Sequence, residues 1–119
     1  MASYLPLFRP GDTVTFNVTT AVTGGQAVEV GTTDMSVAPA AAGSAKYVGV
    51  AGHDAAVGDK LTVEIGKPIH ELKVVGAVAR GAKLETAAAG TVRTVAEGDA
   101  VFLALTSAAD GALVRAIQL

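Results

Sequence analysis

A single pattern recurs in AVTGGQAVEVG (residues 21–31), AAVGDKLTVEIG (55–66), AVARGAKLETAAAG (77–90) and VAEGDAVFLAL (95–105). Each segment begins with a short apolar lead-in, reaches a glycine (Gly25, Gly58, Gly81 or Gly98) and continues with apolar residues at every second position. A glycine adopts turn conformations that a Cβ would penalise, and period-two alternation buries one face of a strand. The repeated pattern therefore predicts a small all-β fold built from hairpins.

The rest of the chain adds further short alternating segments between turn residues. Residues 69–75 are expected to return antiparallel to 60–66 after the turn at Gly66, and residues 53–59 form a tight connection with room for one helical turn. About nine or ten short strands at this spacing indicate a small β-sandwich or β-barrel of short antiparallel strands. One expected strand carries Val28 and Val30 after the turn at Gly25. The others are 13–20, 35–37, 45–52, 60–66, 69–75, 82–86, 91–95, 100–106 and 112–119.

The length of 119 residues fits one domain, which we place at residues 11–119 behind an extended N-terminal arm of residues 1–10. Half of the residues are apolar, but only 4% are aromatic, since Ala and Val predominate. We therefore expect a thin core, or one that another subunit completes.

Composition also bears on the classes of partner. The net charge is −2 and the nine Lys and Arg residues are scattered singly, so no direct nucleic-acid contact is expected. No apolar run reaches membrane-spanning length, and the N-terminus lacks the pattern of a signal peptide. The chain has no cysteine, which excludes disulfides and thiolate metal sites. We expect a soluble, unsecreted protein.

The arm has its own composition. Apolar bulk is crowded between Pro6 and Pro10, and these prolines disfavour both a helix and a central strand. Such an arm either folds back over its own domain or docks on a neighbouring molecule. We predict partner contacts at Tyr4, Leu5, Leu7, Phe8 and Arg9.

The nearest approach to a chemical site is His53-Asp54 together with His70-Glu71. His70 and Glu71 are adjacent on an expected strand and point to opposite faces, and no spacing makes three or four ligands converge. No serine lies in a nucleophile-elbow context, so we expect no enzyme, no catalytic residue and no cofactor. The alternative function is a small β-barrel ligand-binding or carrier module, with a metal site at His53 and His70 or a carrier lysine at Lys83.

Several segments resemble the small capsid decoration (cement, or head-stabilising) proteins of tailed bacteriophages. The resemblance spans about residues 10–117. Its most specific pieces are Pro10-Gly11-Asp12, Thr23-Gly24-Gly25-Gln26, Gly49-Val50-Ala51, Asp54-Ala55-Ala56-Val57-Gly58 and the Gly76–Gly81 turn. These residues are structural signatures, and none of them is a catalytic motif.

The resemblance implies a structural, non-enzymatic protein of the virion. Such a protein would bind the outer surface of the phage head through the major capsid protein and stabilise the head, after a stage in the host cytoplasm. It also implies self-association, as a homotrimer or alternatively as a dimer or monomer. Members of this family differ most at their N-terminal arms and loops, so the partner contacts predicted above are not transferred from a family motif.

Overall fold

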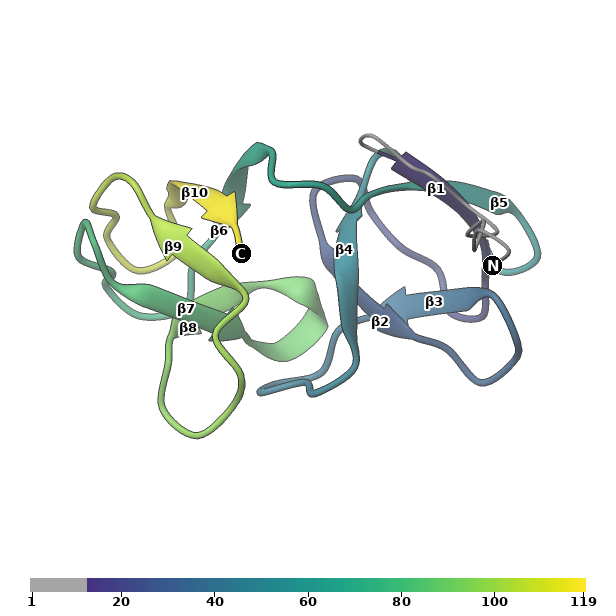
Figure 1. Ribbon diagram of the computed structural model, residues 1–119, viewed down its shortest axis with the longest axis horizontal. Helices are drawn as coiled ribbons and strands as arrows, with labels where there is room; N and C mark the ends of the chain where they lie inside the picture. The colour runs from purple at the N-terminus through teal and green to yellow at the C-terminus, as the bar shows by residue number, and fades with distance from the viewer. Residues whose placement is uncertain (1–12) are drawn as a thin grey trace, which may run out of the picture.

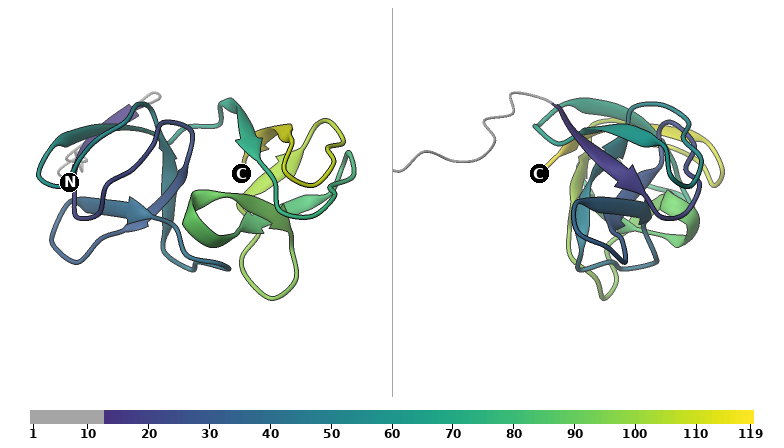
Figure 2. Two further views of the ribbon diagram at one scale, coloured as in Figure 1. Left: turned by 180° about the vertical axis from the view of Figure 1, so that it is seen from behind. Right: turned by 90° about the vertical axis from the view of Figure 1, so that its right-hand side faces the viewer.

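The computed structural model describes residues 13–119, and its regular secondary structure consists almost entirely of β-strands, as the sequence predicts. The strands form two five-stranded units that lie side by side along the long axis of the molecule (Figure 1). We call residues 13–65 the first unit and residues 66–119 the second unit. The described residues extend 48 × 38 × 23 Å, and Figure 2 shows the two units from behind and from one end. No helix in this part of the chain is long and apolar enough to cross a membrane.

The first unit is a closed barrel with the strand order β1-β3-β2-β4-β5. β1 and β5 pair antiparallel from Thr13 opposite Glu64 to Asn17 opposite Lys60, and the parallel pairing of β1 with β3 closes the barrel. Leu61 and Val63 are fully buried, as the alternation in this strand predicts. Its strands are β1 Thr13–Val18, β2 Ala27–Val30, β3 Ser36–Pro39, β4 Tyr47–Ala51 and β5 Lys60–Glu64.

The second unit repeats this topology with the order β6-β10-β9-β7-β8. A parallel bridge between Val74 and Val92 links its first and third segments, as β1 and β3 are linked in the first unit. A glycine hydrogen bond also occurs at corresponding places in the two units. The N–H of Gly58 donates to Val18 O at 3.1 Å, and the N–H of Gly111 donates to Val74 O at 3.0 Å. The chain therefore contains an internal structural repeat. Its elements are β6 Ile69–Lys73, β7 Lys83–Thr86, the 3₁₀ turn η1 Ala88–Gly90, β8 Val92–Thr94, β9 Phe102–Ala104 and β10 Leu113–Gln118.

The glycine turns follow this repeat. Gly25, Gly58 and Gly81 have φ values of 90°, 88° and 88°, so each occupies the left-handed region that favours glycine. The fourth turn of this kind is at Gly111 with φ 79°, and the prediction for Gly98 is wrong. Gly98 is needed for a different reason, since a Cβ there would lie 2.6 Å from the Cα of Gly43.

Two further expectations are corrected. Residues 69–75 do not pair with 60–66, because β6 pairs along its whole length with β10 and begins the second unit. Residues 53–59 contain no helical turn, and the Asp54 carboxylate instead accepts the N–H of Gly24 at 2.8 Å.

Each unit has its own core, and one strand contributes to both. Val18, Val28, Leu61 and their neighbours form the core of the first unit, whereas Phe102 is the largest fully buried side chain of the second. Val50, on β4 of the first unit, packs in the second core. The contact between the units is thus part of the hydrophobic interior.

Candidate functional surfaces

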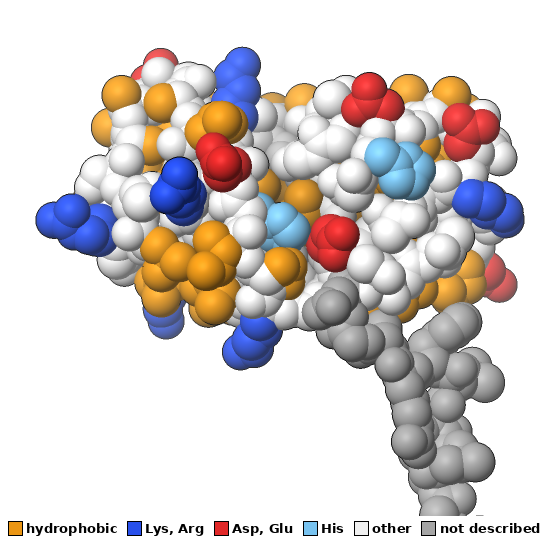
Figure 3. All heavy atoms as spheres, turned by 90° about the horizontal axis from the view of Figure 1, so that it is seen from above, with side chains coloured by type: hydrophobic (Ala, Val, Ile, Leu, Met, Phe, Trp, Pro, Cys, Tyr) orange, Lys and Arg blue, Asp and Glu red, His pale blue; other side chains and the backbone are white. Residues whose placement is uncertain are grey.

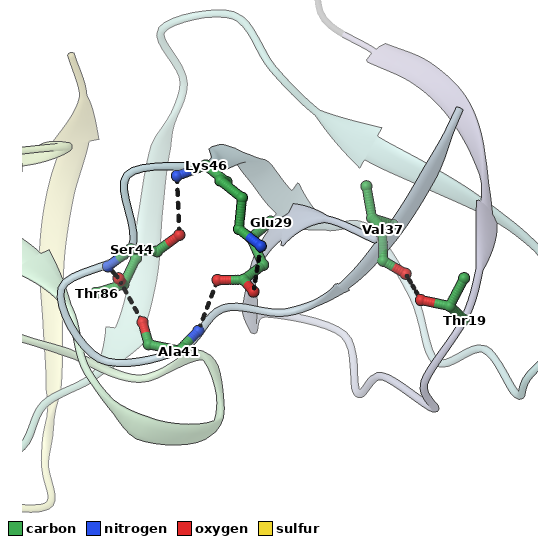
Figure 4. Close-up of polar contacts among 7 residues, drawn as sticks. All are labelled: Thr19, Glu29, Val37, Ala41, Ser44, Lys46 and Thr86. Carbon is green, nitrogen blue, oxygen red and sulfur yellow. Dashed lines mark hydrogen bonds and ion pairs between the residues drawn. The ribbon is translucent and has the colours of Figure 1, made fainter. Parts of the chain in front are cut away.

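A loop of the first unit crosses to the second and is held by a chain of polar contacts (Figure 4). Ser44 N–H donates to Thr86 Oγ1 at 2.9 Å, and that hydroxyl donates to Ala41 O at 2.8 Å. Ala41 N–H in turn donates to Glu29 Oε1 at 2.9 Å, and the other Glu29 oxygen lies 3.8 Å from Lys46 Nζ. These side chains are therefore used to fix the loop between the units.

Glu85 serves the same junction from the second unit. Its carboxylate is fully buried and accepts the N–H groups of Ala96 at 2.8 Å and Gly98 at 2.7 Å, with Arg93 Nε 3.1 Å away. The Ala96 N–H, followed by those of Gly98 and Arg93, holds the pKa of the Glu85 carboxyl below its usual value. A carboxylate so fully occupied is a structural anchor for the 96–98 loop.

Tyr47 makes the third connection between the units. Its hydroxyl donates to Gln118 Oε1 at 2.8 Å, and Gln118 Nε2 donates to Gly66 O at 2.9 Å. The Tyr47 ring packs edge-on against Phe102 with centroids 5.4 Å apart. Burial strongly raises the pKa of the Tyr47 hydroxyl.

The two histidines lie in different units. His53 connects its turn to β5, since its Nε2 accepts the N–H of Thr62 at 3.2 Å. His70 packs against Phe102 from β6, and Glu71 beside it is exposed, so the two point to opposite faces as predicted. Within residues 13–119, no group of three or more His, Cys, Asp or Glu side chains could hold a metal ion.

An open groove of about 400 Å³ runs between the units. The first unit contributes its 23–26 turn, and the second contributes η1 and the ends of β6 and β10. Among residues 13–119, Glu71 and Lys73 are its only charged lining residues, and this described lining contains no nucleophile–base pair. The lining residues are Thr23, Gly24, Gly25, Gln26, Glu71, Lys73, Ala89, Gly90, Thr91 and Leu113.

The outward side of β6, β10 and β9 carries large apolar residues that the sequence analysis did not single out. Ile117 on β10 lies opposite Ile69 on β6 and Leu103 on β9, so the three form one row across the sheet. Ile69 is 59% exposed and Leu119 is 51% exposed. We call this surface the outer face. The sequence signal for this surface is the last strand, where apolar residues occur on both the inward and the outward positions.

The predicted partner-contact residues lie outside the described part of the chain. This holds for Tyr4, Leu5, Leu7, Phe8 and Arg9. The described surfaces therefore offer the junction groove and the outer face, and neither of them carries a catalytic arrangement.

Comparisons with known proteins agree with this description. Residues 8–118 match the family described as phage cement protein. No curated protein matches the chain. Among solved structures, the head fiber gp8.5 N base of bacteriophage phi29 is similar with a TM-score of 0.72 and 20% sequence identity, over 90% of this chain and 92% of that one. At this identity, the structural likeness bears on the fold.

Proposed function

This chain belongs to the phage cement protein family, and from that membership we propose that it binds the outer surface of a phage head through the major capsid protein and stabilises the head. A structural role in association with the capsid follows from the family itself. Beyond this role, we propose the major capsid protein as the partner, the outer surface of the head as the binding site, and stabilisation of the head as the effect.

The observation that carries the proposal is the family match over residues 8–118, which covers all but the last residue of the described body. The structure supports it, because the buried polar side chains described above are engaged in holding loops and joining the two units. A rigid body with free surfaces suits a protein that acts by contact. Many identical contacts on a closed shell add up through multivalency.

We place the capsid contact in the N-terminal arm, at Tyr4, Leu5, Leu7, Phe8 and Arg9. The reason is their concentrated apolar bulk in a segment whose prolines disfavour regular structure. An extended arm can add to a sheet edge or fill an apolar groove on a partner.

We further propose that the protein self-associates as a homotrimer, with a dimer or monomer as the alternatives. It would be present in the host cytoplasm before assembly and on the outside of the capsid afterwards.

Co-sedimentation with expanded heads that lack the protein tests this function. We expect saturable binding of the full chain at a fixed number of copies per head, and absence of binding would contradict the proposal. Deletion of residues 1–9 should abolish binding, whereas Ser3→Ala in the same arm should leave it unchanged. Undiminished binding of the deletion variant would overturn the arm assignment while leaving the function intact.

A further inference from the structure

The outer face combines an apolar centre with a cationic rim. The row of Ile69, Ile117 and Leu103 continues in register to Lys83 on β7. Arg115 projects from β10 on the same side, two residues before Ile117. In Figure 3, hydrophobic side chains gather on the second unit with Lys and Arg side chains around them.

Further along this face, Glu71 lies opposite Arg115, and Lys73 lies opposite Leu113. Together with Lys83 of β7, the outward positions of β6, β10 and β9 therefore carry the cations Lys73, Lys83 and Arg115 against the carboxylate Glu71. On β7 and β8, Glu85 and Arg93 pair with each other. The outer face therefore has an excess of positive charge, although the net charge of the whole chain is −2.

The first unit has the opposite balance. Its described residues hold only two cations, Lys46 and Lys60, against the carboxylates Glu29, Asp34, Asp54, Asp59 and Glu64.

Two exposed turns of the first unit combine this negative charge with apolar side chains. Asp34 precedes Met35, which is 47% exposed, and Val57, which is 65% exposed, lies two residues before Asp59. Both turns flank the end of β1, since Met35 O accepts the N–H of Asn17 and Gly58 donates to Val18 O. We call Asp34, Met35, Val57 and Asp59 the acidic end. Lys60 lies beside it, and its ammonium donates to Asn17 Oδ1.

We propose that the outer face of one copy binds the acidic end of a second copy, head to tail. Two outer faces brought together would oppose their cationic rims, whereas the acidic end offers carboxylates to the rim and apolar side chains to the centre. Because the two surfaces differ and lie on different units, the contact is heterologous, and a pair of copies keeps one acidic end and one outer face free. Repetition closes a ring when the rotation permits. The inference rests on the self-association proposed above and assigns the surfaces that make it.

The test uses purified full-length protein in sedimentation velocity, without heads. Lys83→Glu/Arg115→Glu alters the outer face, and Asp34→Lys/Val57→Lys alters the acidic end. We expect each double variant to weaken self-association at least about tenfold. Arg80→Glu, in the exposed turn before β7, changes the net charge by half as much as the face variant does and should associate like the wild type. Circular dichroism and thermal melting establish that each variant is folded.

Mixing the two variants distinguishes the geometry. A face-altered copy still has its acidic end and an end-altered copy still has its outer face, so the mixture should form a 1:1 heterodimer and nothing larger. Normal self-association of the end-altered variant would point to a face-to-face contact and overturn the proposal. A wild-type chain that stays monomeric at roughly millimolar concentration would overturn it as well. Since the assay contains no heads, a failure of capsid binding leaves these results unaffected.

Discussion

Gly98 lies where backbone segments of the two units approach each other closely. A Cβ at this position would meet the Glu85 carboxylate and lie 2.6 Å from Gly43 Cα, and neither neighbour is a flexible side-chain end that is free to move. We expect Gly98→Ala to lower the free energy of unfolding by about 3 kcal/mol, as overpacking does. Chemical denaturation measures this change.

Gly111→Ala is the matched control, because a Cβ there meets nothing within 4 Å and only the positive φ of 79° is penalised. Its effect should be about 1 kcal/mol. Equal effects of the two substitutions would show that close approach is not the reason for a glycine at position 98.

His70 gives the protein a dependence on pH. Burial lowers the pKa of its imidazole, against smaller opposing effects of Gln118 and the Glu64 carboxylate, and its Nε2 is buried without a hydrogen-bond partner. The folded protein therefore holds the proton less tightly than the unfolded chain does. Above the usual histidine pKa the ring is neutral in both states, and the free energy of unfolding keeps its full value. As the pH falls below that value, the unfolded chain takes up the proton more readily, and the free energy of unfolding decreases.

We expect the thermal midpoint of the wild type to fall between about pH 7 and pH 5, where an unperturbed histidine titrates. His70→Phe should flatten this part of the profile. An equally steep profile in the variant would assign the titration to another group, and His53→Gln serves as the control for the other histidine.

The sequence does not distinguish a glycine required by a positive φ from one required by the close approach of another segment. Gly98 and Gly111 both lie beside an aspartate and before an alternating strand, so local pattern alone suggests the same turn for both. What separates them is the approach of Gly43 from the other unit, which no local pattern encodes. For the same reason the sequence shows the glutamate at position 85 but not its burial.

At the level of elements, the alternation of single strands was predictable and their partners were not. Leu61 and Val63 point inward as expected, because burial of one face is a local property. The partner of β6 is β10 at the other end of the chain, and the parallel pairing of β1 with β3 closes the barrel. Such pairings depend on distant segments, so the antiparallel return to residues 60–66 was the natural but wrong expectation.

The link between β4 and β10 offers a test of the contact between the units. Tyr47→Phe removes the hydrogen bond to Gln118 and keeps the ring against Phe102, so we expect a loss of about 1 kcal/mol in the free energy of unfolding. Tyr47→Leu should lose about 1 kcal/mol more, because the edge-on aromatic contact is removed as well.

Gln118→Met serves as the second arm of a double-mutant cycle with Tyr47→Phe. A coupling near zero between the two substitutions would mean that the hydrogen bond contributes nothing to stability.

At the scale of the whole molecule, the sequence shows that short glycine segments repeat, but it does not show that the repeating unit has five strands. Four glycine segments were visible, whereas the structure is a tandem of two five-stranded units whose corresponding strands pair in the same order. Val50 of the first unit packs in the core of the second, so the tandem is held together internally. Its distinct outer surfaces remain available for assembly. The sequence does not predict the outer face, because a short strand with apolar residues on both sides has the same pattern as a fully buried strand.

The central claim is that this tandem acts as a cement on a phage head. The most direct measurement is the temperature at which filled, expanded heads lacking the protein release their DNA, with and without added full-length protein at saturating occupancy. We expect release to shift to a higher temperature as occupancy rises, and we expect no shift with the variant lacking residues 1–9. Full occupancy without any change in the release temperature would contradict it.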